Sequence, residues 1–168
     1  MCEEQAKVAV SYTLPTGREL IGFVHKTNGP GAFAVGDWAE LSDEVTTEDV
    51  LAFALISRDC QWIHCDIAGA TAQFGGLVVH GALTCSLVSA LLGNVFPGSG
   101  TIYLENGINF KKMVIAPNKI TVRATITEYT EKSAKGKMRL AVEITNQDGD
   151  LVAQGHALVL VPLTAISA

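Results

Sequence analysis

Two stretches of the chain carry the apolar pattern of helices. In the first, Thr46 stands three residues before Asp49, and apolar residues follow at Val50, Phe53 and Ala54. A hydroxyl residue followed by an acidic one at this spacing is a common helix start. In the second, an uncharged apolar run ends at a Gly-Asn pair, which is a typical helix stop. The pattern predicts one helix over 47–57 and another over about 81–92, closed by Gly93-Asn94.

The second predicted helix has no charged residue and so no face suited to water, and we expect it to be buried on most sides. The chain also looks extended over 77–79, just before this helix. After the helix, segments rich in Val, Ile and Thr predict strands. Polar turns at 132–136 and 146–150, the latter with an Asp-Gly pair, favour antiparallel pairing of neighbours. The predicted strands, expected to form a meander, are 102–114, 119–131, 137–146 and 151–161.

A long antiparallel sheet buries a central apolar helix most simply by curling around it. The sequence therefore predicts an α+β protein with one hot-dog domain, in which the sheet wraps the helix over 81–92. We assign this domain to residues 37–168. Residues 1–36 are interpreted as an N-terminal extension with a strand over 20–24 and a turn-rich stretch over 28–31.

Composition narrows the classes of function. The 168 residues include 12 basic and 17 acidic side chains, and no Lys/Arg run could neutralise a row of phosphates. Nucleic acid is not an expected partner. The longest apolar stretch is interrupted by polar residues, so no membrane span is expected. The N-terminal residues lack the pattern of a signal or transit peptide, which favours a cytoplasmic location. Four unevenly spaced cysteines are interpreted as reduced thiols.

A carboxylate and an imidazole, Asp59 and His64, lie five positions apart in a predicted loop. Loops between rigid elements commonly carry catalytic groups, although Asp59 could equally serve as a cap or turn residue. Further along, Gly81 stands at the start of the buried helix, where backbone N–H groups have no internal partners. Its N–H could hold a thioester oxygen as charge develops there. The other interpretation is that Gly81 only permits close packing of helix and strand.

Several motifs together resemble the MaoC-like (R)-specific enoyl-CoA hydratases, also called hydratase 2. They cover about residues 40 to 162 in the expected order. The quoted motifs are Val45-Thr46-x-Glu48-Asp49-Val50-x-Ala52-Phe53-Ala54, Ser57-x-Asp59-x4-His64-x-Asp66, Phe74-Gly75-Gly76-x-Val78-Val79-His80-Gly81, Ser86-Leu87-x-Ser89-x2-Leu92-Gly93 and Pro97-Gly98-x-Gly100-x-Ile102-Tyr103-Leu104.

The resemblance implies a hot-dog homodimer that hydrates trans-2-enoyl thioesters, giving the (3R)-hydroxyacyl product from an acyl-CoA or acyl-carrier-protein substrate. The resemblance implies no metal or organic cofactor. Coenzyme A enters as part of the substrate and does not count as a cofactor. The resemblance places the catalytic pair at Asp59 and His64 and the thioester-binding glycine at Gly81. Further residues are expected in supporting roles (Gln61, His80 and Ser86) and in the acyl pocket (Trp62 and Phe74).

The motif around the pair departs from the family pattern Gly-Asp-x-Asn-Pro-x-His. Arg58, Gln61 and Trp62 occupy the Gly, Asn and Pro positions. Gln61 keeps an amide but extends it by one methylene, and Trp62 introduces a large ring where proline fixed φ. We expect Trp62 to narrow the acyl tunnel and to favour short acyl groups.

Other kinds of chemistry are less well supported. Thiolate and imidazole are preferred zinc ligands, but the spacing matches no finger or ribbon, and no metal site is assigned. The residues weighed for zinc were Cys60, His64, Cys65, Asp66, His80 and Cys85. A nucleophilic Cys60 has no separate support. Lys111 and Lys112 could meet coenzyme A phosphates. Three alternative functions stay open: dehydration on acyl-carrier protein, thioester hydrolysis, and acyl binding without catalysis.

Overall fold

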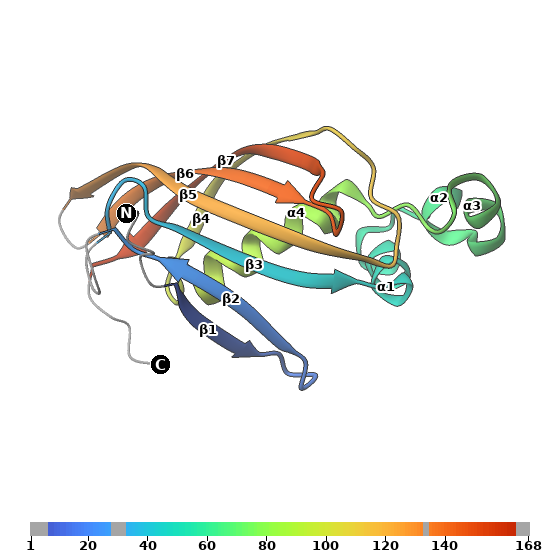
Figure 1. Ribbon diagram of the computed structural model, residues 1–168, viewed down its shortest axis with the longest axis horizontal. Helices are drawn as coiled ribbons and strands as arrows, with labels where there is room; N and C mark the ends of the chain where they lie inside the picture. The colour runs from blue at the N-terminus through green and yellow to red at the C-terminus, as the bar shows by residue number, and fades with distance from the viewer. Residues whose placement is uncertain (1–6, 28–32, 133–134, 164–168) are drawn as a thin grey trace, which may run out of the picture.

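The computed structural model describes residues 7–27, 33–132 and 135–163, and a seven-stranded antiparallel sheet dominates it (Figure 1). Along the sheet the strands lie in the order β1-β2-β3-β5-β6-β7-β4. Their bounds are β1 Val8–Thr13, β2 Glu19–His25, β3 Trp38–Val45, β4 Ile102–Phe110, β5 Asn118–Lys132, β6 Lys135–Thr145 and β7 Leu151–Pro162.

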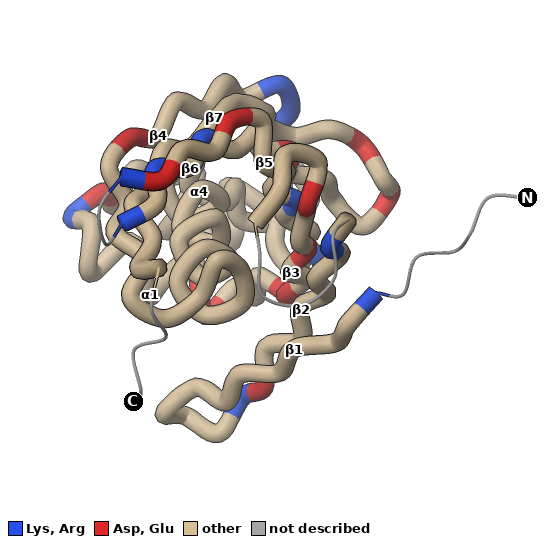
Figure 2. The backbone as a smooth tube through the Cα atoms, turned by 90° about the vertical axis from the view of Figure 1, so that its left-hand side faces the viewer, with Lys and Arg blue, Asp and Glu red and all other residues tan. Residues whose placement is uncertain are grey.

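The helices lie in the middle of the chain, between β3 and β4. Helix α4 runs along one face of the sheet, and α2 and α3 project beyond one end of it (Figure 1). Viewed from the end, the strands arch around α4, which confirms the predicted hot-dog fold (Figure 2). The helices are α1 Thr47–Ser57, α2 Trp62–Cys65, α3 Ile67–Phe74 and α4 Gly81–Ala90, followed by a π-helical turn, η1 Leu91–Val95. No helix in the described ranges has the length and apolarity needed to cross a bilayer.

The core lies between α4 and the concave face of the sheet. Alternate residues of β5 are fully buried, as expected for a strand with one face turned inward, and β6 follows the same rule. Each large aliphatic side chain buried in this way contributes about 1.5–3 kcal/mol. The central buried residues include Val88, Leu91, Leu92, Ile120, Val122, Ile126, Leu140, Val142 and Ile144.

Helix α1 begins where the sequence predicts. The Asp49 N–H donates to Thr46 Oγ1 at 3.1 Å, and the Thr46 N–H donates to Asp49 Oδ2 at 2.8 Å. This reciprocal capping box satisfies donors that have no partner within the helix. The start and the end of the predicted helix over 47–57 are therefore confirmed.

The end of the central helix differs from the prediction. Regular α-helix stops at Ala90, and the chain widens into the η1 turn over Leu91–Val95. The pair Gly93-Asn94 lies inside this turn and does not end it. Leu91, Leu92 and Val95 are buried, so tertiary packing holds the turn through residues that would break an isolated helix.

The predicted meander is right for three strands and wrong for the fourth. Strands β5, β6 and β7 pair in sequence order, but β4 pairs with β7 at the far edge. Strand β3, which the sequence did not predict, lies beside β5 in place of β4. The two strands pair from Trp38↔Thr125 to Val45↔Asn118. The segment over 77–79 contributes one isolated bridge, Val78↔Ile115.

Strands β1 and β2 form a hairpin that extends the sheet at its β3 edge. The predicted strand over 20–24 is confirmed within β2, whereas β1 was not predicted. The hairpin projects from the rest of the sheet (Figure 2). Gly22 lies so close to Val95 that an added Cβ would fall 2.6 Å from its Cγ1. The predicted turn over 28–31 falls outside the described residues, and the division of the chain near residue 36 stays a prediction.

Helix α4 is less covered than expected. Its inner positions Thr84 and Val88 are buried, but Ala82, Ser86 and Ser89 are exposed in the single chain. The prediction of burial on most sides is therefore wrong for this face within one chain. The exposed face carries no charge, which is unusual for a helix side that meets water.

Arg58 provides a test of the local backbone. It closes α1 with φ 67°, in the left-handed region that favours glycine, and its Nη1 donates to the Leu55 carbonyl at 2.9 Å. A residue with a side chain in the left-handed region destabilises the folded state by roughly 1–2 kcal/mol. Replacing it with glycine removes this strain, but glycine also loses more chain entropy on folding, which offsets about 0.5–1 kcal/mol of the gain. We expect Arg58→Gly to raise the free energy of unfolding by about 0.5–1 kcal/mol, measured by urea denaturation at fixed protein concentration.

Arg58→Ala is the matched control, because it keeps the left-handed strain and loses only the guanidinium bond. It should be neutral or slightly destabilising. If Arg58→Gly destabilised the protein as much as Arg58→Ala, the guanidinium bond would outweigh the backbone strain.

Candidate functional site

The site is organised around the extended segment Leu77–Val79. The Val78 N–H donates to the Ile63 carbonyl at 2.9 Å, and the Val79 N–H donates to the Val114 carbonyl at 2.8 Å. The segment is thus fixed to α2 on one side and to the chain before β5 on the other. The start of α4 follows two residues later, so its position is fixed by the same bonds.

His64 is buried at this junction. The sequence predicted a loop here, but His64 lies on the short helix α2. Asp66 ends α2 and is at the same time the N-cap of α3, so the two helices follow one another directly. His64 is 7% exposed, and its Nδ1 lies 2.6 Å from the Val78 carbonyl oxygen. A carbonyl oxygen only accepts, so Nδ1 carries the proton. In the neutral ring, Nε2 is then the free acceptor.

Asp59 approaches His64 from the loop between α1 and α2. Its carboxylate is 56% exposed, and Oδ2 lies 3.9 Å from His64 Nε2. Most of its other bonds are local: its N–H donates to Ser57 Oγ at 3.2 Å, and its Oδ1 accepts from the Gln61 N–H at 3.4 Å. The structure therefore brings the predicted pair together.

The separation of the pair has a chemical meaning. At 3.9 Å, the two atoms are too far apart for a direct hydrogen bond. Two acceptors that share one water, each at about 2.8 Å, stand about 4–4.6 Å apart. The gap between Asp59 and His64 is close to this span. Both facing atoms are acceptors, so they can bind both hydrogens of one water and leave its lone pairs free.

His80 contacts both members of the pair. It is 2% exposed, and its Nε2 donates to the Asp59 carbonyl oxygen at 2.9 Å. Its ring stacks on the ring of His64, with centroids 3.7 Å apart and planes inclined by 18°. The Phe53 ring also lies against the His80 ring, with centroids 5.1 Å apart.

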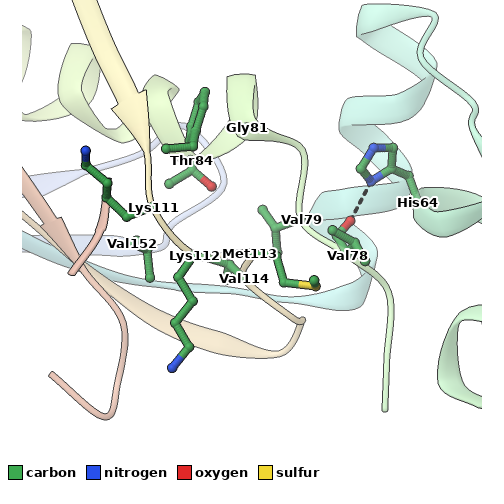
Figure 3. A pocket seen from close by; sticks show the side chains of 11 residues that line it. His64, Val78, Val79, Gly81, Thr84, Lys111, Lys112, Met113, Val114 and Val152 are labelled. Atoms are coloured by element: carbon green, nitrogen blue, oxygen red, sulfur yellow. Dashed lines mark hydrogen bonds between the residues drawn. The ribbon is translucent and has the colours of Figure 1, made fainter. Parts of the chain in front are cut away.

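Gly81 and His64 line the same pocket, which has a volume of about 520 Å³ (Figure 3). Gly81 is the first residue of α4, where backbone N–H groups have no partner within the helix. An added Cβ at Gly81 would fall 2.8 Å from Phe110 Cζ. This contact supports the packing interpretation of Gly81, and it leaves the N–H free for a ligand. The pocket lining is His64, Val78, Val79, Gly81, Thr84, Phe110, Lys111, Lys112, Met113, Val114 and Val152.

The remaining predicted site residues lie further out. Ser86 is exposed on α4, donates to the Leu83 carbonyl, and lines a second pocket beside Tyr103. Gln61 is exposed and precedes α2. Trp62 stacks on Phe74 with ring centroids 5.9 Å apart, but neither residue lines the pocket that contains His64. Their assignment to the acyl site stays a prediction.

Two alternative kinds of chemistry can be compared with this geometry. Cys60, the nucleophile considered from the sequence, donates its thiol to the Ala54 carbonyl at 3.7 Å. For its neighbour Cys65, burial raises the pKa of the thiol, which makes Cys65 poorly suited to act as a nucleophile. Ligand atoms of Asp59, His64 and His80 lie within 4.8 Å of one another. A metal must lie in the plane of each coordinating imidazole at about 2 Å. The His64 and His80 rings are stacked with their planes inclined by only 18°, so they do not direct two nitrogen lone pairs at one shared ion.

Sequence reasoning missed the partners that fix the pair. The Val78 carbonyl, the Phe53 ring and the lining residues Phe110 and Val152 all come from distant segments. One signal was available: Val78 and His80 lie in the motif that ends at Gly81, and residues just before a helix start are well placed to meet a neighbouring loop. Nothing in the local pattern indicated which loop that would be.

Comparisons with known proteins agree with the fold and identify the family. Residues 37–148 match the family described as MaoC like domain. An (R)-specific enoyl-CoA hydratase of Aeromonas caviae is 38% identical over 129 residues, which is 76% of this chain and 95% of that protein. A 3-hydroxybutyryl-CoA dehydratase of Methylorubrum extorquens is 30% identical over 73% of this chain and 76% of its own length.

The solved structures give the same result. The structure of an (R)-hydratase from A. caviae involved in PHA biosynthesis superposes with a TM-score of 0.72 and 36% identity, over 78% of this chain and 98% of that one. The family match over residues 37–148 contains strands β3 to β6, α4 and the segment with Asp59, His64 and Gly81. The chain belongs to the MaoC-like family of hydratases and dehydratases on the hot-dog fold.

Proposed function

We propose that the protein catalyses the reversible hydration of a trans-2-enoyl-CoA to the (3R)-3-hydroxyacyl-CoA. The observation that carries the proposal is the 3.9 Å separation of His64 Nε2 and Asp59 Oδ2, beside a pocket that His64 shares with Gly81. Relatives named as a hydratase and as a dehydratase support both directions of one equilibrium. The (3R) configuration follows the hydratase relative.

The pair would aim and activate water. Asp59 and His64 each accept a hydrogen bond from the water, which turns an oxygen lone pair of the water toward the β-carbon of the substrate. As the C–O bond forms, the pair accepts one proton from the water, and the α-carbon receives one proton, so water is added across the double bond. Such assistance typically accelerates a reaction about 10²–10⁴-fold.

Gly81 would supply the second half of the catalysis. The β-carbon is electrophilic only while the thioester carbonyl is polarised, and addition moves negative charge onto that oxygen. The Gly81 N–H and the positive end of α4 are preorganised donors for this charge. The groups required all belong to the protein, and coenzyme A enters with the substrate. A soluble acyl-CoA pool in the cytoplasm fits this proposal.

The first test replaces each member of the pair with a neutral amide. Asp59→Asn and His64→Gln should each lower kcat/KM for crotonyl-CoA by about 10²–10⁴-fold, because an amide cannot take up the proton that the water releases. The assay follows the loss of the conjugated enone absorbance. Asp148→Asn, which changes an exposed carboxylate in the turn before β7, is the matched control and should retain full activity.

Unchanged rates in both variants would remove the pair from the mechanism. Release of free thiol from acyl-CoA by the wild-type protein would favour the thioesterase alternative. Saturable binding of acyl-CoA without turnover would indicate a binding subunit.

Lys111 bears on the carrier of the acyl group. Lys111 and Lys112 both line the pocket, but Lys112 pairs with Asp150 at 2.5 Å. Lys111 has no ion-pair partner within the described ranges, and its side chain extends toward α4, away from that of Lys112 (Figure 3). In a protein with a net charge of −5, an unpaired ammonium beside the pocket favours an anionic carrier. We propose that it contacts a phosphate of coenzyme A.

We expect Lys111→Ala to raise KM for crotonyl-CoA about three- to fivefold, because an exposed ion pair contributes up to about 1 kcal/mol. KM for crotonyl-pantetheine, which lacks the phosphates, should not change, and kcat should stay the same for both. Lys137→Ala, on the exposed face of β6, is the control. Equal KM changes for the two substrates would contradict the phosphate contact.

A second copy of the chain is the proposed partner. Strand β4 has a neighbour on one side only, and its exposed residues include Ile102, Leu104 and Phe110. It adjoins the uncharged exposed face of α4, with the pocket beside Tyr103 between them. Pairing of two β4 edges would satisfy the unpaired backbone groups and cover both surfaces.

The dimer can be tested on α4. Ser89→Glu places a carboxylate on the exposed helix face and its symmetric copy nearby, so we expect the dimer to dissociate at least about tenfold more readily. Sedimentation equilibrium measures the change. Thr130→Glu, at the far end of β5, should leave association unchanged. A wild-type protein that is monomeric at micromolar concentration would contradict the proposed partner.

A further inference from the structure

His80 is the point where three parts of the site meet. It immediately precedes Gly81, it donates from Nε2 to the Asp59 carbonyl at 2.9 Å, and its ring stacks on His64 at 3.7 Å. At 2% exposure it is more buried than His64. A residue in this place can fix the backbone of one catalytic group and the ring of the other.

The Asp59 loop needs such an anchor. Asp59 follows a left-handed residue, and its bonds to Ser57 and Gln61 reach only two positions along the chain. The bond to His80 spans 21 positions. Within the described ranges, it is the hydrogen bond that ties Asp59 to the central helix. Without it, nothing in the local contacts fixes the distance from the carboxylate to His64.

The proton positions strengthen this interpretation. The Asp59 carbonyl only accepts, so His80 Nε2 carries the proton, and Nδ1 is the acceptor of the neutral ring. Nδ1 is buried and has no hydrogen-bond partner among the described residues. A buried imidazole with one unsatisfied nitrogen is costly, and such groups persist where another requirement holds them. The two contacts to the pair supply that requirement.

We infer that His80 is a positioning residue, which holds Asp59 by its backbone and His64 by ring stacking so that the two acceptors keep the spacing of one water. The inference rests on the proposed hydration. It predicts that His80 acts on turnover and not on substrate binding, because His80 is not among the residues that line the pocket. Misplacing a reacting group by about 1 Å can cost on the order of 10²-fold in rate.

Two variants separate its two contacts. His80→Gln keeps an N–H donor for the Asp59 carbonyl and removes the ring, whereas His80→Phe keeps a ring between Phe53 and His64 and removes the donor. We expect kcat for crotonyl-CoA to fall about 10–100-fold in each, with KM changed less than about threefold. His25→Gln, which alters a histidine stacked on Trp38 far from the pair, should leave both constants unchanged.

A double-mutant cycle distinguishes positioning from general damage. If His80 acts through Asp59, then Asp59→Asn should cost at least about tenfold less in the His80→Phe background than in the wild type, because the carboxylate is already misplaced there. The corresponding cycle with Lys111→Ala should be additive. Circular dichroism and thermal unfolding verify that the variants fold. If His80→Phe does not fold, the same double-mutant cycle is measured with His80→Gln in its place.

The outcomes bear on different conclusions. A wild-type protein that hydrates no enoyl-CoA would end the proposed function. An active wild type in which both His80 variants keep kcat within threefold, or in which the effects of His80 and Asp59 are additive, would overturn the role of His80 and leave the proposed function standing.

Discussion

One residue, Val78, holds the site to the fold. Its N–H donates to the Ile63 carbonyl at 2.9 Å, and its carbonyl accepts from His64 Nδ1 at 2.6 Å. A single residue therefore fixes both the helix that carries His64 and the tautomer of the His64 ring. Because hydrogen bonds buried in a low-dielectric interior are strong and costly to break, α2 cannot shift against this segment without losing both. The direction of His64 Nε2 follows from this constraint.

The same segment fixes the other half of the chemistry. Three residues after Val78 the chain enters α4 at Gly81, so the free N–H of Gly81 is placed by the bonds that place His64. Asp59 is different, because it lies on an exposed loop outside this frame. The site therefore combines a rigid acceptor and a rigid donor with one carboxylate whose position depends on longer contacts. Preorganisation is most valuable at groups that meet developing charge, which is the role proposed for these two rigid groups.

The parts that local chemistry determines were predictable. The capping box of Thr46 and Asp49 fixes the start of α1 within four residues, and the turn at 146–150 closes as expected around Gly149, with φ 82°. Alternation in β5 and β6 likewise reflects the pleat of each strand.

The place of β4 was not predictable, because it depends on which strand edge remains free after β3 has paired with β5. The stacking of His64 and His80 also joins segments with no shared local pattern. The motifs indicated the residues that are proposed to react, but the contacts that orient them arise only in the folded chain.

The three substitutions around Asp59 illustrate how the loop keeps its shape with different residues. Trp62 is the first residue of α2, a position where an N–H has no partner within the helix, so replacing proline there costs no hydrogen bond. The restraint on φ is lost, and the stacking of Trp62 on Phe74 fixes the turn instead. Gln61 reaches Asp59 through its backbone N–H, so this bond does not depend on which amide side chain is present. Arg58 makes the left-handed turn that glycine would make and adds a bond to the end of α1. Arg58, Gln61 and Trp62 thus each have a contact that fixes the backbone around Asp59, and on our inference the separation of Asp59 from His64 depends on that backbone and on His80.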